Sequence, residues 1–96
     1  MYFNYTRKGD RIYEVKQYNF QFQAQDVATI FIHDFLDGTY RFDIRFTDGR
    51  IPLEEQAIAS ADASLPHIPA TFTSLQETLQ AAIDEATLRS EKYFTA

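Results

Sequence analysis

Two Asp-Gly pairs constrain the fold of this chain more than any other local feature. Asp37-Gly38 and Asp48-Gly49 each lie between runs in which apolar and polar residues alternate. Such a pair is a strong short-range signal of a β-hairpin, because Asp and Gly tolerate the positive φ angles of tight two-residue turns. Two pairs in succession therefore predict an antiparallel β-meander, with a positive φ at Gly49 in the second turn.

The segment between the two pairs indicates how the predicted sheet is buried. From residue 39 to residue 47, apolar and polar side chains alternate. The apolar side chains are those of Tyr40, Phe42, Ile44 and Phe46, and the charged ones between them are those of Arg41, Asp43 and Arg45. Successive side chains of a strand point to opposite faces, so this strand has one face in the core and one in solvent.

A two-residue turn at Asp37-Gly38 also predicts how this strand pairs with the one before it. In that register Phe35 lies opposite Tyr40 on the core face. Ile30 and Ile32 have the other parity, so they are placed on the outer face beside charged residues. Apolar side chains bordered by charges resemble the centre and rim of a protein interface. The candidate partner-binding residues on this outer face are Ile30, Ile32, Arg41 and Arg45.

The N-terminal half is predicted to contain a first hairpin. Residues 2–7 and 12–23 form its strands, with a loop at residues 8–10. Within the second strand the apolar parity changes between Val15 and Tyr18. A strand changes face only with an extra residue, so we expect a β-bulge near residues 16–17.

The C-terminal half is predicted to contain an edge strand, a connection and a helix. Residues 51–53 form a short fifth strand at the sheet edge, because the central proline has no N–H for the ladder. Residues 54–72 show no sustained period and are predicted to be a connecting loop. Ser74 and Glu77 form a capping box at the start of an amphipathic helix over about residues 74–90.

Together these elements predict a single α+β domain over all 96 residues. An antiparallel β-meander of about five strands, over residues 2–53, precedes one C-terminal amphipathic helix that packs on one sheet face. A helix about 10 Å wide covers only two or three strands that lie about 4.8 Å apart. Part of the sheet face is therefore left for the 54–72 loop, a second copy of the chain, or a partner or ligand.

The composition is typical of a folded protein of the cytoplasm. Hydrophobic residues make up 45% of the sequence. The apolar run at residues 27–32 is far shorter than the roughly 20 residues of a membrane span, and the N-terminus lacks the pattern of a signal peptide. The absence of cysteine excludes disulfides, thiolate zinc sites and thiol catalysis. We therefore expect a cytoplasmic protein without a membrane partner.

The charge is distributed unevenly along the chain. The net charge is −5, and residues 1–50 contain seven basic and seven acidic residues, whereas residues 51–96 contain two and seven. Nucleic-acid binding requires a basic surface, so we expect no direct nucleic-acid partner. The helix half carries the acidic excess, which favours a partner with a basic surface. The candidate partner-binding residues on the helix are Glu77, Asp84, Glu85 and Glu91.

The sequence lacks motifs for catalysis or cofactor binding. It contains no glycine-rich phosphate loop, no nucleophile elbow and no metalloprotease helix. His33 and Asp34 are adjacent, but neighbouring strand residues point to opposite faces, so the two side chains cannot converge on one ligand. With two histidines and no cysteine, a zinc site would need carboxylates from distant segments. We expect no catalytic residue, no cofactor and no metal.

Three classes of function fit these features, and no family resemblance selects among them. The leading hypothesis is a non-enzymatic protein-binding protein of the inhibitor or immunity type, of bacterial or phage origin, that docks on a basic partner surface. The first alternative is a small-molecule-binding or enzymatic domain with a cavity between sheet and helix near His33. The second is a structural homo-oligomer, and the uncovered part of the sheet favours a homodimer.

Overall fold

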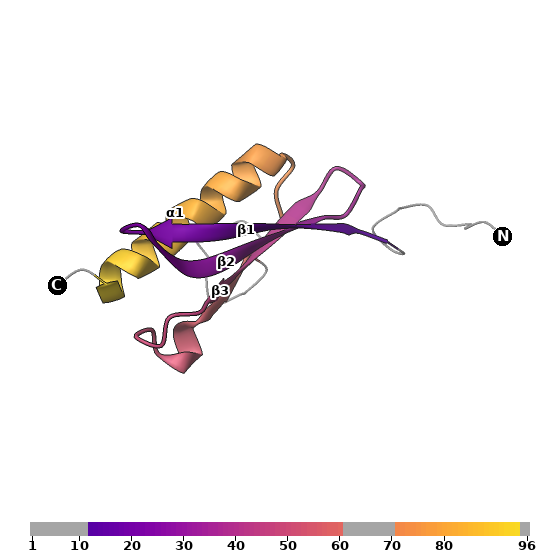
Figure 1. Ribbon diagram of the computed structural model, residues 1–96. Helices are drawn as coiled ribbons and strands as arrows, with labels where there is room; N and C mark the ends of the chain where they lie inside the picture. The colour runs from indigo at the N-terminus through magenta and orange to yellow at the C-terminus, as the bar shows by residue number, and fades with distance from the viewer. Residues whose placement is uncertain (1–11, 61–70, 95–96) are drawn as a thin grey trace.

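The computed structural model describes residues 12–60 and 71–94, so the predicted first strand at residues 2–7 lies outside the described residues. An antiparallel sheet with the strand order β1-β2-β3-β4 packs against one C-terminal helix (Figure 1). This arrangement confirms the predicted α+β class. Its elements are β1 (Glu14–Phe22), β2 (Gln25–Asp34), β3 (Tyr40–Phe46), the 3-10 helix η2 (Leu53–Glu55), β4 (Ala57–Ala59) and α1 (Leu75–Phe94).

Helix α1 covers one face of the sheet and forms the core with it. Figure 1 shows the helix running diagonally across the strands, and it contacts β1, β2 and β3. Alternate residues of β2 and β3 point into this core, as their burial shows. From the helix, Ala82 and Ala86 are fully buried, and their small side chains leave room for the larger residues of the sheet.

The connection between β2 and β3 is longer than the predicted two-residue turn. Asp34 pairs with Tyr40, which leaves residues 35–39 outside the ladder. Within this connection Leu36 and Gly38 adopt positive φ angles of 62° and 91°. The Asp34 carboxylate accepts the Leu36 N–H at 2.8 Å and so stabilises the first bend. The Asp-Gly signal marks the place of the hairpin but not the length of its loop.

This loop length shifts the register of β2 against β3 by one residue. Because strand side chains alternate, such a shift moves every side chain of β2 to the other face. Ile30 and Ile32, predicted on the outer face, are in the core and are 1% and 0% exposed. His33, predicted near a cavity between sheet and helix, is on the face away from α1. Neither isoleucine can therefore contribute to a docking surface.

The change of apolar parity in β1 has a different cause from the predicted bulge near residues 16–17. Val15 pairs with His33, and the register continues without a break through Tyr18. The two apolar side chains therefore lie on opposite faces, with Tyr18 packed against the core. The register shifts only between Phe20 and Gln21. Strand β1 thus places apolar side chains on both faces of the sheet.

The segment after β3 differs from the predicted edge strand at residues 51–53. Ile51 packs in the core and is 1% exposed, whereas Leu53 begins η2 and is 81% exposed. The edge strand is β4, which pairs with β3 and lies within the segment predicted as a loop. Helix α1 extends to Phe94, four residues beyond its predicted end at residue 90.

The second Asp-Gly pair bends the chain without the predicted positive φ at Gly49. In the described part of the chain, Gly38 is the glycine that adopts a positive φ. The Asp48 carboxylate accepts the Arg50 N–H at 2.9 Å and pairs with the Arg50 guanidinium at 2.7 Å. This Asx turn supplies the bend through a side chain, so a positive φ is not needed.

We expect Ile32→Ala to lower the free energy of unfolding by about 2–5 kcal/mol, because it opens a cavity in the core. Val15→Ala is the matched control, since Val15 is 44% exposed on the other face and its truncation should change stability by about 0.5 kcal/mol or less. Urea denaturation of the two variants measures both effects. Equal losses, or a larger loss for Val15→Ala, would contradict the observed register.

The two glycines of the Asp-Gly pairs should respond differently to alanine. Gly38→Ala should destabilise the fold by about 1 kcal/mol, because a Cβ is disfavoured at the positive φ of this residue. Gly49→Ala should leave stability unchanged or slightly higher, since no atom lies within 4 Å of the added Cβ. Thermal denaturation distinguishes the variants, and a reversed order would show that the second pair is the strained turn.

Candidate functional site

We call the face of the sheet opposite α1 the open face. Its side chains come from the residues of β1, β2, β3 and the adjoining loops that alternate with core residues. They are Tyr13, Val15, Gln17, Asn19, Thr29, Phe31, His33, Phe35, Arg41, Asp43, Arg45 and Thr47. Tyrosine, phenylalanine and arginine are enriched in the centres of protein interfaces. The alternation that buries the isoleucines thus exposes a set of residues typical of an interface.

A hydrogen-bonded pair, His33 and Asp43, joins β2 to β3 on the open face, and we call it the central pair. His33 Nε2 lies 2.7 Å from Asp43 Oδ2. The two side chains are 21% and 36% exposed, so the pair is accessible from solvent. With Nε2 donating to the carboxylate, the imidazole plane is fixed and Nδ1 remains as the second polar atom of the ring. The pair is a fixed polar point on a mainly aromatic and basic surface.

Aromatic rings and an arginine lie along one side of the central pair. The ring centroid of Tyr13 is 5.6 Å from that of His33 and 5.5 Å from that of Phe35. The rings of His33 and Phe35 are stacked, with an interplanar angle of 18°. The Arg41 guanidinium lies 5.3 Å from the Phe35 centroid, within the range of a cation–π interaction. Tyr13 is still 53% exposed, so this cluster is open to a partner.

Two depressions of the open face flank the central pair, which lines both of them. The first has a volume of about 160 Å³ and includes Phe35 and Arg41. The second has a volume of about 410 Å³ and includes Phe31 and Arg45. Each depression therefore combines one arginine and the shared central pair with aromatic rings, Phe35 and Phe42 in the first and Phe31 in the second.

The shape of the depressions favours a macromolecular partner over a small ligand. Small-molecule sites are usually concave, measure roughly 300 Å³ or more and enclose most of the ligand. The first depression is smaller than that range, and the second, although large enough, is open to solvent and would not enclose a ligand. His33 lines them from the open face and not from beneath α1.

The structure brings some of the predicted partner-binding residues together and separates others. Arg41 and Arg45 are exposed on the open face, where the alternation of their strand placed them. Sequence reasoning placed Asp43 on the same face as these arginines but missed Phe31 and His33 as members of that surface. The register error explains this omission, because it assigned His33 and Phe31 to the core. A five-residue connection at residues 35–39, in place of the predicted two-residue turn, gives the observed register. Only with that register do Phe31 and His33 face away from the core.

The predicted acidic residues of α1 fall into two groups. Glu77, Asp84 and Glu91 are exposed and lie seven residues apart, which places them along one stripe of the helix. Glu85, predicted in the same surface, is only 8% exposed, and its carboxylate lies 3.6 Å from the Arg89 guanidinium. The acidic surface of the helix is therefore smaller than predicted.

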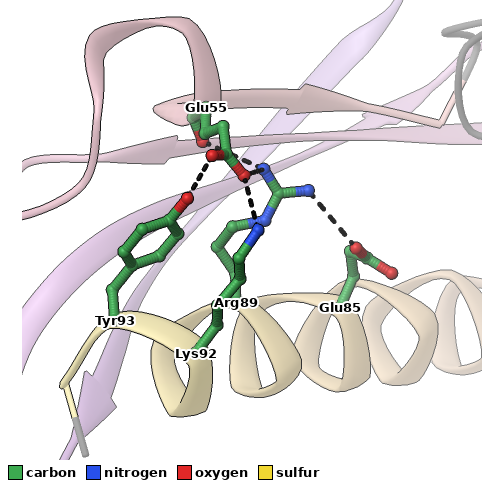
Figure 2. A network of polar contacts seen from close by, with 5 residues as sticks. All are labelled: Glu55, Glu85, Arg89, Lys92 and Tyr93. Atoms are coloured by element: carbon green, nitrogen blue, oxygen red, sulfur yellow. Dashed lines mark hydrogen bonds and ion pairs between the residues drawn. The ribbon is translucent and has the colours of Figure 1, made fainter.

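Glu55 and the C-terminal half of α1 form a network of polar contacts (Figure 2). The Glu55 carboxylate accepts a hydrogen bond from the Tyr93 hydroxyl and lies 3.2 Å from Arg89 and 3.5 Å from Lys92. Figure 2 shows Arg89 between Glu55 and Glu85, so one guanidinium contacts both carboxylates. These contacts hold η2 against the helix. We assign them to the stability of the fold.

The network shifts the pKa values of its members. The hydrogen bond from Tyr93, together with the charges of Lys92 and Arg89, holds the pKa of Glu55 below its usual range. The same hydrogen bond raises the pKa of the Tyr93 hydroxyl. A lowered carboxylate pKa means that the folded state prefers the charged form. The Glu55 contacts therefore stabilise the fold above the usual glutamate pKa, and this stability is lost as the pH falls through the folded-state value.

We expect Glu55→Gln to lower stability at neutral pH and to flatten the loss of stability below about pH 5, because the variant has no carboxylate to protonate. Urea denaturation midpoints between about pH 7 and pH 3 measure both effects. Some acid sensitivity should remain, since Arg50 lowers the pKa of Asp48 to about 2. Glu54→Gln is the matched control at an exposed neighbour. A Glu55→Gln profile parallel to that of the wild type would refute this role for the network.

Residues 12–60 and 71–94 contain neither a cluster of metal ligands nor a membrane-spanning helix. Among residues 12–60 and 71–94, no three histidine, cysteine, aspartate or glutamate side chains gather where they could hold a metal ion. No helix within these ranges combines the length and the apolar character that crossing a membrane requires.

Comparison with known proteins adds no family assignment. The chain matches no family model, no curated protein and no solved structure. Its function therefore has to be inferred from the geometry of the open face and from the charges around it.

Proposed function

We propose that the protein is a non-enzymatic protein-binding domain that docks on another protein through its open face. The observation that supports this proposal is the central pair, set among exposed aromatic residues and arginines on the face away from α1. Aromatic residues and arginine supply much of the binding energy in known interfaces. A cytoplasmic inhibitor or immunity-type protein acts through such a surface, and we assign the protein to this class.

The open face is well suited to binding because two of its polar side chains, His33 and Arg41, are held in place by neighbours. The imidazole of His33 is held by Asp43, and the Arg41 guanidinium rests on the Phe35 ring. Binding costs less when side chains do not have to be immobilised during association. A surface of this kind, built on paired strands, presents its contacts in a fixed geometry.

The charges of the open face modify the predicted choice of partner. Arg41 and Arg45 outnumber the carboxylate of Asp43 on this face, so it attracts an acidic surface. Two copies joined through their open faces would bring the arginines of both copies together. A homodimer, which the sequence favours, would therefore have to use another surface.

The acidic stripe of α1 is our second candidate for a docking surface, and it retains the basic partner predicted from the sequence. Leu88 is 60% exposed between Asp84 and Glu91 along the helix. An exposed leucine bordered by carboxylates has the apolar centre and charged rim of a small interface. We rank it second because it offers one apolar side chain, whereas the open face offers an aromatic cluster.

Charge reversal on each surface separates the two candidates. We expect Arg41→Glu with Arg45→Glu to reduce capture of a protein partner from the native host by tenfold or more, with little change in stability, because exposed charges contribute little to folding. Asp84→Lys with Glu91→Lys is the matched control and should leave capture intact. Quantitative mass spectrometry of the captured proteins measures both. Loss of the partner only in the helix variant would overturn the open-face proposal and support the acidic stripe.

A further inference from the structure

Two cationic side chains lie at a fixed separation on the open face. Arg41 and Arg45 are four residues apart on β3 and point to the same side of the sheet. A strand rises about 3.4 Å per residue, so their Cα atoms are about 13 Å apart. Each arginine lines a different depression, and the central pair lies between the two depressions.

The separation of the arginines matches one kind of protein segment. In an extended chain, residues i and i+4 point to the same face and are also about 13 Å apart. In an α-helix, the same two residues lie only about 6 Å apart on the helix surface. An extended segment with two carboxylates at this spacing could therefore reach both arginines at once, whereas a helical segment could not.

We propose that the open face binds an extended acidic segment of its protein partner, with carboxylates at positions i and i+4 on Arg41 and Arg45. This inference rests on the proposed function. Each guanidinium donates two N–H groups to a carboxylate, the geometry that gives the strongest charge-assisted hydrogen bonds. The residue at i+2 lies over the central pair, which favours a hydroxyl or amide side chain there.

The phenylalanines of the depressions complete the two subsites. Phe35 lies in the first depression with Arg41, and Phe31 lies in the second with Arg45. The methylene groups of a glutamate side chain can pack on a ring while its carboxylate reaches the guanidinium. An aromatic ring accompanies the cation in both depressions, which fits glutamate better than a shorter acidic side chain.

The charges favour a peptide over a single strand of nucleic acid, which is the other extended anion. Nucleic-acid binding depends on a basic surface that neutralises many phosphates. The open face has two arginines with the Asp43 carboxylate between them, and the net charge of the chain is −5. Two carboxylates spaced like the two arginines match this face. A nucleic acid carries a phosphate on every nucleotide, so one phosphate would lie near the Asp43 carboxylate and be repelled by it.

Short synthetic peptides test the proposed spacing. Three fluorescein-labelled peptides of identical composition, rich in threonine and serine, carry two glutamates at i,i+4, at i,i+3 or at i,i+5. Odd spacings place the second glutamate on the opposite face of an extended chain, so one arginine loses its partner. We expect the i,i+4 peptide to bind more tightly in fluorescence polarisation, by roughly tenfold or more, the effect of about one charge-assisted hydrogen bond. The preference should weaken as salt is added.

Two variants show whether the arginines cause the preference for glutamates at i,i+4. Arg41→Gln and Arg45→Gln should each abolish the preference for i,i+4, whereas Asp84→Asn, on the acidic stripe of α1, should retain it. Equal binding of the three peptides, or a preference that survives both arginine variants, would overturn the inference. Tighter binding of a short oligothymidylate than of the i,i+4 peptide would overturn it in favour of nucleic acid. If the spacing has no effect but arginine reversal still abolishes partner capture, the proposed function stands and only the extended acidic segment is rejected.

Discussion

The Asp34 carboxylate accepts the Leu36 N–H at 2.8 Å and stabilises a bend at the end of β2. The chain then needs five residues, 35–39, to connect β2 to β3. The parity of that connection determines which side chains of β2 face the helix. With the observed register, Ile30 and Ile32 pack beneath α1, and His33 comes within hydrogen-bonding distance of Asp43. The core and the open face therefore depend on the same local turn.

The sequence predicts the parts of this fold that depend on a single strand or helix. Alternation alone placed Arg41 and Arg45 on the face opposite the core residues of β3, and the Ser74 cap marked the start of α1. Pairing between strands needs the loop length as well, and an Asp-Gly pair is compatible with more than one length. The composition of the open face depends on pairing, so its central pair could not be found from the sequence.

Contacts between distant segments set a second limit on sequence-based prediction. Helical periodicity places Glu85 away from the apolar stripe, yet it is only 8% exposed and lies beside the Arg89 guanidinium. The Arg89 guanidinium also donates a hydrogen bond to the carboxylate of Glu55, 34 residues earlier in the chain. No local pattern in the helix shows such a contact. The acids that remain exposed on the helix are Glu77, Asp84 and Glu91, at seven-residue spacing.

A further reason to propose binding at the open face is that some of its apolar side chains are only partly buried. Tyr13 and Val15 remain 53% and 44% exposed, although complete burial of a large apolar side chain is worth about 1.5–3 kcal/mol. A small domain has only about 5–15 kcal/mol of net stability, so this exposure is a substantial fraction of the total. The fixed central pair adds a polar contact point at the middle of the same surface. A partner that covers this surface recovers the lost apolar burial, which gives the exposed cluster a physical reason to persist.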